Sequence, residues 1–373
     1  MKVMTVVGTR PEIIRLSMVM HKLDEYLDHI IVHTGQNYDY ELNEIFFNDL
    51  KVRKPDHFLN ADTSSAASTI GSIIIEFDKV LGIVKPDALL VLGDTNSCLA
   101  ALPAKRRKIP IFHMEAGNRC FDDRVPEEIN RRIVDHTADI NLTYSDIARE
   151  HLIREGIKSD RVIKTGSPMN EILNYFNKDI NNSKILHTLK LNKEKFFLLS
   201  FHREENIDAE NNFRKIIELV EYLAIHFDYP VIISTHPRTR KKIDQEKIKF
   251  HKNVNLLKPL GFFDYNYLQK NALIVFSDSG TITEESSILN FPAINIRESH
   301  ERPEGFEEGS VIMSGLDLEI IKDSISLIKD QPRGDHRLLR LVRDYDAPNV
   351  SDKVLRIILS YTKYVDRNVW KKY

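Results

Sequence analysis

The chain has 373 residues, of which 42% are hydrophobic and 29% are charged, and its formal net charge is −2 at pH 7. This length allows about two domains with ample core, and the balanced charge favours neither nucleic acid nor a membrane surface as a partner. The two cysteines, Cys98 and Cys120, are too few for a disulfide framework. No apolar stretch of the sequence approaches membrane-spanning length, so we expect a cytoplasmic protein.

Short apolar runs alternate with helix-like segments along the whole chain. Strands are predicted at residues 3–7, 30–34, 87–93, 109–113, 140–144 and 162–165, then at 196–201, 230–235, 254–257, 272–277 and 293–296, the last of the chain. Helices are predicted between the strands, and two more follow at 318–329 and 351–372. This alternation is typical of an α/β fold with parallel, doubly wound sheets and right-handed crossovers.

A polar segment separates two sets of predicted strands. Residues 177–195 are rich in Asn and Lys and carry no strong strand, so we place a domain boundary near 168–182. The predicted organisation is a Rossmann-like domain at 1–170, a second one at 171–350, and a final helical segment at 351–373. Two such domains are expected to face each other across a cleft.

Acidic side chains follow two consecutive predicted strands. Asp94 comes directly after the strand at 87–93, and Glu115 follows the strand at 109–113. Ligands bind outside the carboxyl ends of strands in open parallel sheets, so both acids are expected in one crevice. Glu127, just inside the next helix, can join them. Converging carboxylates repel each other and more often mark acid/base chemistry than packing.

Two acid–arginine pairs share faces of the helix that is predicted to begin at Pro126. Glu127 and Arg131 are four residues apart, as are Glu128 and Arg132. For Glu128 and Arg132 we prefer a surface salt bridge on an exposed helix. For Glu127 and Arg131 the predicted convergence of carboxylates favours a functional interpretation.

A second kind of site is predicted where the strand at 272–277 turns directly into a helix through Asp278-Ser279-Gly280-Thr281. Small residues at a helix N-terminus let backbone N–H groups approach a diphosphate, and Ser279 and Thr281 add hydroxyl donors. Glu285, one turn later, could accept hydrogen bonds from ribose hydroxyls. The alternative is a capped helix with acidic residues near its positive end. We favour the phosphate interpretation.

The first predicted strand turns into a helix through Gly8-Thr9-Arg10-Pro11-Glu12. This is neither the dinucleotide fingerprint nor a Walker loop, so nicotinamide or ATP binding is not supported. Such a turn can still hold an anion with the help of Arg10. A tight turn with a solvent-exposed arginine explains the same residues equally well.

Taken together, these motifs resemble the non-hydrolysing UDP-N-acetylglucosamine 2-epimerase family along nearly the whole chain. The resemblance rests on Gly8-Thr9-Arg10-Pro11-Glu12, Gly93-Asp94-Thr95, residues 113–117 and 126–131, Asp278-Ser279-Gly280, Glu284-Glu285 and Glu301-Arg302-Pro303-Glu304. Within the family, the chain is most similar to the branch that makes UDP-N-acetyl-L-fucosamine for capsules and O-antigens. That similarity lies in residues 117–121, 202–206, 234–240 and 278–291.

The resemblance implies the GT-B fold, a last helix packed on the first domain, a homodimer, and neither a cofactor nor a metal. It also implies epimerisation at C2 of a UDP-sugar, by elimination and re-addition of UDP. The substrate implied by the branch is UDP-2-acetamido-2,6-dideoxy-L-talose, with interconversion of UDP-GlcNAc and UDP-ManNAc as the nearest alternative. A GT-B glycosyltransferase and a non-catalytic sugar-nucleotide-binding module are more distant alternatives.

The resemblance also assigns roles to single residues. The acid/base candidates are Asp94, Glu115 and Glu127, with Arg131 orienting a carboxylate and His202 binding or protonating the departing phosphate. The residues expected to bind UDP are Arg10, Arg15, His236, Tyr265, Ser279, Gly280, Thr281, Glu285 and Arg302. Arg15 stands where the family usually has a lysine, and a structural role stays open for His113 and His236.

The chain departs from the better-known branch of the family at two places. Gln36-Asn37-Tyr38 replaces Gln-His-Arg, and His202-Arg203-Glu204-Glu205 replaces His-Arg-Arg-Glu. In the family these positions lie near the site where UDP-GlcNAc activates some epimerases. The departures therefore argue against that regulation and in favour of a different substrate.

Overall fold

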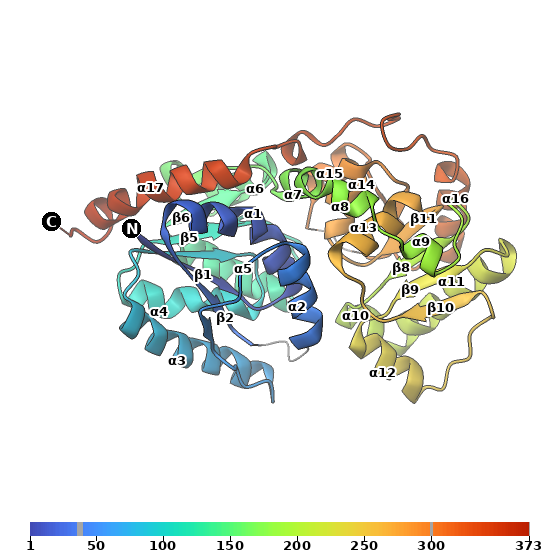
Figure 1. Cartoon of the computed structure of the whole chain (residues 1–373), viewed down its shortest axis with the longest axis horizontal. Coiled ribbons are helices and arrows are strands. Elements are labelled where there is room, and N and C mark those ends of the chain that lie inside the picture. The colour runs from blue at the N-terminus through green and yellow to red at the C-terminus, as the bar shows by residue number, and fades with distance from the viewer. Residues whose placement is uncertain (36–39, 299–300, 373) are drawn as a thin grey trace. The chain divides into compact units, whose positions relative to one another are not determined.

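The computed structural model describes residues 1–35, 40–298 and 301–372 (Figure 1). The sequence Gln36-Asn37-Tyr38 and the side chains of Glu204 and Glu205, on which the departures from the family pattern partly rest, lie outside the described part. The chain divides into two compact units. Unit 1 comprises Met1–Tyr175 and Arg343–Tyr373, and unit 2 comprises Phe176–Val342.

Unit 1 is built on a parallel sheet of seven strands in the order β3-β2-β1-β4-β5-β6-β7. These strands are β1 (Lys2–Val7), β2 (Asp28–His33), β3 (His57–Phe58), β4 (Ala88–Leu92), β5 (Ile111–Met114), β6 (Ile140–Thr143) and β7 (Val162–Lys164). Its helices are α1 (Arg10–Tyr26), α2 (Tyr40–Asp49), α3 (Ala66–Val84), η1 (Asn96–Ala100), α4 (Ala101–Arg106), α5 (Pro126–Thr137), α6 (Asp146–Arg154), η2 (Ser159–Arg161), α7 (Met169–Tyr175), η3 (Arg343–Tyr345) and α17 (Val350–Asn368).

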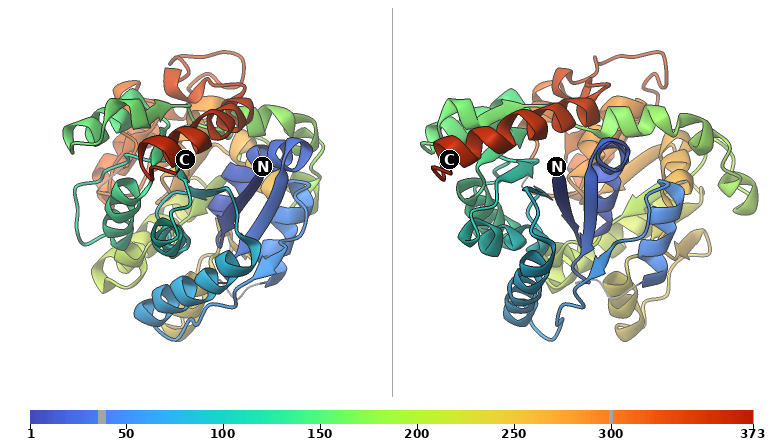
Figure 2. Two further views of the ribbon diagram at one scale, coloured as in Figure 1. Left: turned by 90° about the vertical axis from the view of Figure 1, so that its left-hand side faces the viewer. Right: turned by 60° about the vertical axis from the view of Figure 1, so that its left-hand side comes forward.

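Helices cover both faces of the unit 1 sheet. Every residue of β4 and β5 is buried, as expected for central strands of a parallel sheet that is apolar on both sides. In Figures 1 and 2, α3 and α4 lie on one face of the sheet, and α1 and α17 lie on the other. The strand order reverses between β1 and β4 in the middle of the sheet. The carboxyl ends of these two strands therefore form a topological switch point.

The last helix, α17, closes unit 1 by packing on α1. Val350, Val354 and Ile358 are fully buried along one stripe of the helix, as its amphipathic pattern requires. The backbone N–H of Ser351 donates to Glu171 at 2.8 Å, which ties the start of α17 to α7. The end of the chain thus belongs to the same compact unit as its beginning.

Unit 2 repeats the architecture with a parallel sheet of six strands in the order β10-β9-β8-β11-β12-β13. These strands are β8 (Phe197–Ser200), β9 (Val231–Ser234), β10 (Val254–Leu257), β11 (Ile274–Ser277), β12 (Ala293–Asn295) and β13 (Ile312–Met313). Its helices are α8 (Asn177–Asn181), α9 (Ile185–Thr188), α10 (Glu204–Ile207), α11 (Glu210–His226), α12 (Pro237–Gln245), α13 (Phe262–Asn271), α14 (Thr281–Leu289), α15 (Pro303–Glu307) and α16 (Leu318–Ile328).

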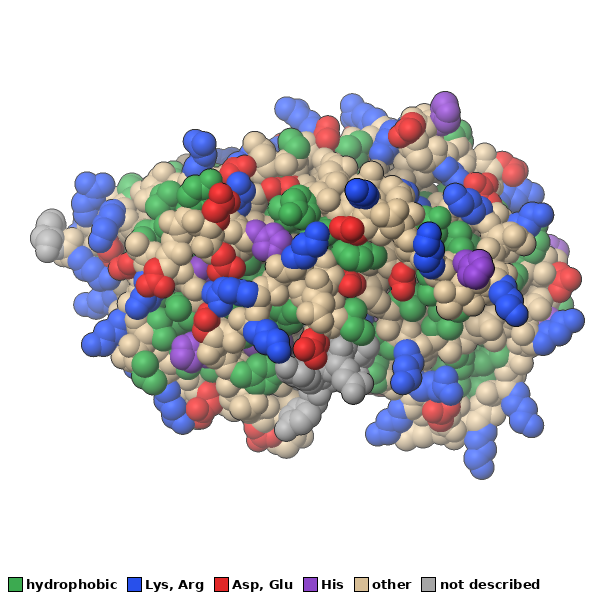
Figure 3. All heavy atoms as spheres, in the orientation of Figure 1, with side chains coloured by type: hydrophobic (Ala, Val, Ile, Leu, Met, Phe, Trp, Pro, Cys, Tyr) green, Lys and Arg blue, Asp and Glu red, His purple; other side chains and the backbone are tan. Residues whose placement is uncertain are grey.

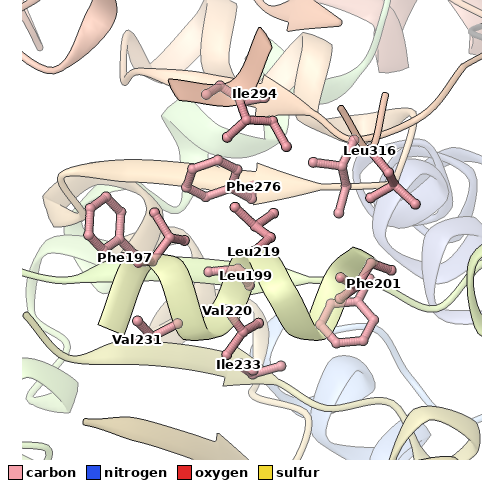
Figure 4. Close-up of a cluster of buried hydrophobic side chains, with 14 of the residues drawn as sticks. Phe197, Leu199, Phe201, Leu219, Val220, Val231, Ile233, Phe276, Ile294 and Leu316 are labelled. Carbon is pink, nitrogen blue, oxygen red and sulfur yellow. The ribbon is translucent and has the colours of Figure 1, made fainter. Parts of the chain in front are cut away.

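One face of the unit 2 sheet forms a dry apolar core with α11. Leu219 and Val220 of the helix pack against strand residues that include Phe197, Phe276 and Ile294 (Figure 4). Each of these side chains is at most 1% exposed, and burying a side chain of this size contributes about 1.5–3 kcal/mol. This core holds the carboxyl ends of β8 and β11 side by side, so the residues that follow these two strands lie close together.

The prediction of two parallel α/β domains is confirmed, with differences in the short elements. The strand predicted at 293–296 is not the last, because β13 pairs with β12 in parallel. Both β13 and β3 contain only two residues, too few to show a periodicity. The polar segment at 177–195 contains the short helices α8 and α9. The contacts place the unit boundaries after residues 175 and 342, where the sequence placed them after 170 and 350.

Charged side chains of both signs are interspersed on the face shown in Figure 3. None of the helices within residues 1–35, 40–298 and 301–372 has the length and apolar character needed to cross a membrane.

The turn after β5 depends on a glycine. Gly117 has a φ of +84°, and a Cβ at this position would lie 2.2 Å from the carbonyl oxygen of Ala148. Gly156 has a similar φ of +90°, with nothing within 4 Å of its Cβ position. We expect Gly156→Ala to cost about 1 kcal/mol from backbone strain alone, and Gly117→Ala to cost more than about 3 kcal/mol. Urea unfolding of both variants measures the difference, and equal losses would contradict this account.

Candidate active site

Two acid-bearing turns lie next to each other in unit 1 because β4 and β5 are paired in register. Leu92 is opposite Met114, and the N–H of Gly93 donates to the carbonyl oxygen of Met114 at 3.0 Å. Asp94 and Glu115 therefore leave the same edge of the sheet. A Cβ at Gly93 would lie 4.0 Å from Oε2 of Glu115, so the Glu115 carboxylate lies against the turn that carries Asp94.

Each of these two acids is held by a buried arginine. Oδ2 of Asp94 is 2.6 Å from Nη2 and 2.9 Å from Nε of Arg131. Oε2 of Glu115 is 3.4 Å from Nη1 of Arg15, whose guanidinium also lies 5.6 Å from the centre of the Tyr144 ring. The positive charges reduce the repulsion between the carboxylates, so two ionised acids can share this edge. We call Asp94, Glu115, Arg15 and Arg131 the acid cluster.

Glu127 is half-buried in the first turn of α5, and Arg131 lies one turn further along the same helix. Arg131 contacts Asp94 and, at 3.1 Å, Glu128. The neighbouring Asn130 donates to the backbone carbonyl of Asp94 at 3.0 Å. Through Asn130 and Arg131, α5 is fixed to the Asp94 turn.

The predicted salt bridge between Glu128 and Arg132 is present at 3.0 Å, but the prediction that it lies on an exposed surface is wrong for Glu128. Its carboxylate is fully buried and accepts from the N–H of Cys120 at 3.1 Å, from Arg131 at 3.1 Å and from Arg132 at 3.0 Å. Burial alone would raise the pKa of Glu128, but the Cys120 N–H and the Arg131 charge outweigh it and lower the pKa. The loop before α5 folds over the first turn of the helix, which spacing along a single helix cannot show.

Glu12 is a buried residue that the sequence analysis named only as part of a motif. Its carboxylate accepts from the N–H groups of Gly8 at 2.6 Å and Thr9 at 2.8 Å and from the hydroxyl of Thr95 at 2.6 Å. Burial raises the pKa of Glu12 to about 7, although these donors oppose the shift. Glu12 thereby ties the turn that carries Arg10 to the residue after Asp94. The Thr-x-x-Glu spacing of a capping box was the available signal.

The cysteines are not suited to nucleophilic chemistry. Cys98 is buried, and Sγ of Cys120 lies 3.2 Å from Oε2 of Glu128. Burial raises the pKa of both thiols, to about 11 for Cys120. Since the thiolate is the reactive form, both side chains are inert thiols at neutral pH.

The corresponding edge of unit 2 carries His202 on a buried aspartate. Asp278 accepts from the backbone N–H of His202 at 2.9 Å, from that of Arg203 at 3.0 Å and from Nδ2 of Asn206 at 3.1 Å. Nδ1 of His202 is 3.2 Å from Oδ1 of Asp278. His236 caps the start of α12 with its ring centre 6.0 Å from that of His202. These contacts bring the ends of β8, β9 and β11 together.

The helix N-terminus predicted to bind phosphate is formed as expected, with Gly280 at the N-cap of α14. The Ser279 and Thr281 hydroxyls are 3.1 Å apart. A Cβ at Gly280 would lie 3.3 Å from Oε2 of Glu301, so a side chain there would crowd the turn. Small residues therefore keep this helix end open to a close approach of anionic oxygens.

Three further residues expected to bind UDP lie around α13 and α14. Glu285 is 8% exposed, and its Oε2 accepts from Gln269 of α13 at 2.6 Å. Tyr265 is half-buried one turn before Gln269 on the same helix. Nε of Arg302 is 3.4 Å from Glu284. One carboxylate oxygen of Glu285 is thus engaged by the protein, which limits the acceptor capacity that the sequence suggested for ribose.

The residues singled out in the sequence therefore fall into two groups. Unit 1 holds Arg10, Arg15, Asp94, Glu115, Glu127 and Arg131, and unit 2 holds His202, His236, Tyr265, Ser279, Gly280, Thr281, Glu285 and Arg302. Within the described ranges, no group of three or more His, Cys, Asp or Glu side chains is arranged to hold a metal ion.

Two parallel, doubly wound domains, with sheets of seven and six strands, define a GT-B-type α/β protein. The sequence model of the family described as UDP-N-acetylglucosamine 2-epimerase matches residues 21–359. The chain belongs to the UDP-N-acetylglucosamine 2-epimerase family.

Solved and curated relatives cover nearly the same length. The structure of UDP-N-acetylglucosamine 2-epimerase from Rickettsia bellii is 48% identical, covers 100% of both chains and has a TM-score of 0.93. Methanocaldococcus jannaschii UDP-GlcNAc 2-epimerase in complex with UDP-GlcNAc and UDP is 32% identical, with 96% and 100% coverage and a TM-score of 0.90. UDP-2,3-diacetamido-2,3-dideoxy-D-glucuronate 2-epimerase from Pseudomonas aeruginosa is 33% identical over 87% of this chain and 91% of its own.

Asp278 should control the acid stability of unit 2. Burial alone would raise its pKa, but the charge of His202 and the surrounding N–H donors lower it from 3.8 to about 2. Between these values the unfolded chain binds a proton that the folded chain does not, so stability falls as the pH falls through this window. We therefore compare the free energies of unfolding of the unsubstituted protein and of Asp278→Asn. The difference between them should shrink by about 1 kcal/mol between roughly pH 5 and pH 3. Urea unfolding at each pH measures this change.

Asp323→Asn is the matched control, because Asp323 is an exposed carboxylate on α16 of the same unit. Its stability difference from the unsubstituted protein should be constant over that range. If the Asp278→Asn difference is equally constant, Asp278 does not carry the acid dependence.

Proposed function

We propose that the protein is a UDP-sugar C2 epimerase that acts by elimination and re-addition of UDP. The observation that carries this proposal is the acid cluster, in which Asp94 and Glu115 leave adjacent strands and each lies against a buried arginine. Inversion of a C–H centre requires one group that removes the proton and another that returns it to the opposite face, and two carboxylic acids can do this. A glycosyltransferase does not remove a proton from a sugar carbon, so it does not need this pair of acids.

The chemistry follows from the weak acidity of the C2–H bond beside an acetamido group. A carboxylate removes the C2 proton, the electron pair forms a C1=C2 double bond, and the C1–O bond breaks so that UDP leaves with its electron pair. An acid then delivers a proton to the other face of C2 while a UDP oxygen bonds again to C1. Atoms and electrons balance, and no external oxidant or reductant takes part.

In this proposal the residues of unit 1 move the proton. Asp94, Glu115 and Glu127 are the acid/base candidates, and Arg131 orients Asp94. Arg15 belongs to the proposed UDP-binding set, and its guanidinium also lies against Glu115. Arginine presents a planar fork of donors where the family's lysine presents a point charge, which suits it to holding a carboxylate.

The residues of unit 2 hold the departing UDP in the same proposal. Ser279, Gly280 and Thr281 supply hydroxyl and backbone N–H donors at the start of α14, where the helix dipole favours an anion. His202 stabilises or protonates the leaving phosphate. Binding of the anion in the transition state is the electrostatic part of the catalysis. Arg10, His236, Tyr265, Glu285 and Arg302 complete the proposed UDP-binding set.

We propose UDP-2-acetamido-2,6-dideoxy-L-talose as the substrate, with UDP-N-acetyl-L-fucosamine as the product. The support is the motif similarity at 117–121, 202–206, 234–240 and 278–291. The second candidate is interconversion of UDP-GlcNAc and UDP-ManNAc, and the names of the Rickettsia bellii and Methanocaldococcus jannaschii relatives favour it. We further propose that the enzyme is a cytoplasmic homodimer that serves capsule or O-antigen synthesis.

Incubation of each UDP-sugar in D2O tests the reaction and the substrate together. We expect one deuterium at C2 and the 2-epimer as product, with the L-talo sugar turned over faster than UDP-GlcNAc. NMR at C2 measures both. Faster turnover of UDP-GlcNAc would replace the first substrate by the second. Release of UDP only in the presence of an acceptor would indicate a transferase instead.

Glu115→Gln should separate chemistry from binding. The substitution keeps the side-chain size but removes the proton-accepting group, so we expect turnover to fall by about 100-fold or more. UDP affinity, measured by calorimetry, should stay within about three-fold because the UDP-binding residues of unit 2 are unchanged. Glu76→Gln, at a surface pair with Lys79 on α3, is the control that keeps full turnover. Unchanged turnover in Glu115→Gln would remove Glu115 from the reaction.

A further inference from the structure

A buried histidine joins the two turns that carry the acids. His113 lies in β5 and is fully buried, two residues before Glu115. Its Nε2 is 2.8 Å from the carbonyl oxygen of Gly93, the residue before Asp94. Because a carbonyl oxygen can only accept a hydrogen bond, Nε2 carries a proton and donates it. His113 therefore fixes the backbone of the Asp94 turn to β5.

A buried aspartate holds the other side of the Glu115 turn. The Asp135 carboxylate, on α5, accepts from the backbone N–H of Gly117 at 3.2 Å and from Nη1 of Arg119 at 2.7 Å. Its Oδ1 lies 3.0 Å from Nδ1 of His113. Asp135 thus contacts a residue two positions before Glu115 and a residue two positions after it.

The contact between His113 and Asp135 is a close approach and not a hydrogen bond. Nδ1 of His113 lies 3.0 Å from Oδ1 of Asp135, but this buried nitrogen has no hydrogen-bond partner among the described residues. The Asp135 carboxylate accepts instead from a guanidinium and a backbone N–H. The two side chains therefore pack against each other, and each holds its own turn through its own hydrogen bonds.

We propose that His113 and Asp135 are positioning residues of the acid cluster. Glu115 has a φ of +64°, a conformation that residues with a side chain rarely adopt. The pair restrains the chain on both sides of Glu115 and, through Gly93, restrains Asp94 as well. Displacement of a reacting group by about 1 Å can cost about 100-fold in rate, so loss of the pair should reduce turnover. This part of the inference rests on the proposed function.

Asp139 provides a matched control for a purely structural effect. It is a buried carboxylate of the same unit, and it accepts from Lys105 at 2.5 Å and from the N–H of Ile111 at 3.0 Å. Ile111 begins β5, whereas the acid-bearing turn follows the end of that strand. Asp139→Asn and Asp135→Asn therefore remove the same kind of buried charge at opposite ends of one strand.

The first test needs no activity. In the whole protein labelled with 15N-histidine, NMR should show a slowly exchanging proton on Nε2 of His113, the nitrogen that contacts Gly93, with the resonances assigned by their absence in His113→Asn. Asp135→Asn should shift this signal, because the two side chains are in contact, and Asp139→Asn should leave it unchanged. A His113 Nε2 without a proton in the unsubstituted protein would overturn the proposed contact with Gly93. This holds even if no UDP-sugar is turned over, in which case the proposed function fails separately.

The second test is the split between kcat and binding. Asp135→Asn should lower kcat for C2 deuterium exchange by about 10-fold to 100-fold, with UDP affinity within about two-fold of the unsubstituted protein. Asp139→Asn should keep kcat within about two-fold of the unsubstituted protein, even if its thermal midpoint falls as much as that of Asp135→Asn. Equal losses of kcat in the two variants at equal losses of stability would show a structural role only and would overturn the positioning role.

Discussion

The register between β4 and β5 is the constraint on which the unit 1 site depends. The pairing of Leu92 with Met114 fixes where both strands end, and a shift by one residue would turn every following side chain to the opposite face of the sheet. With this register, the Glu115 carboxylate lies against the turn of Gly93 and Asp94. Both strands are buried on both faces, so the register is held by the core and not by the acids that use it.

Charge compensation explains why such acids can remain close together. Ionised carboxylates cost free energy when they are removed from water, and the cost is offset only by well-placed partners. Nε and Nη2 of Arg131 contact Asp94, and Nη1 of Arg15 contacts Glu115. Arg131 also binds Glu128, which in turn receives the N–H of Cys120. Each acid is therefore held by charges and hydrogen bonds of its neighbours, and a substitution at one member is expected to disturb the others.

The fold class and the positions of Asp94 and Glu115 could be predicted because they depend on local periodicity and on strand order. The contact of Arg131 with Asp94 could not, because Asp94 reaches it from another part of the chain. The burial of Glu128 could not for the same reason, since a loop covers it. Asp135 and Asp278 accept from donors far along the chain, as Glu12 does from Thr95, and only the folded chain shows these donors. Two-residue strands such as β13 carry too little pattern to be predicted.

The two units use one arrangement for two purposes. Asp135 with His113 and Asp278 with His202 are both buried carboxylates beside an imidazole, and both also accept backbone N–H groups from a strand-end turn. Exposure decides what each histidine can do. The His202 side chain is 38% exposed, so it can meet a ligand, whereas the His113 side chain is 0% exposed and can act only through the backbone that it holds. A histidine next to an aspartate is therefore insufficient to identify a group that touches substrate. The same pair in a dry interior serves to fix the neighbouring turns, because buried hydrogen bonds to the backbone are costly to break.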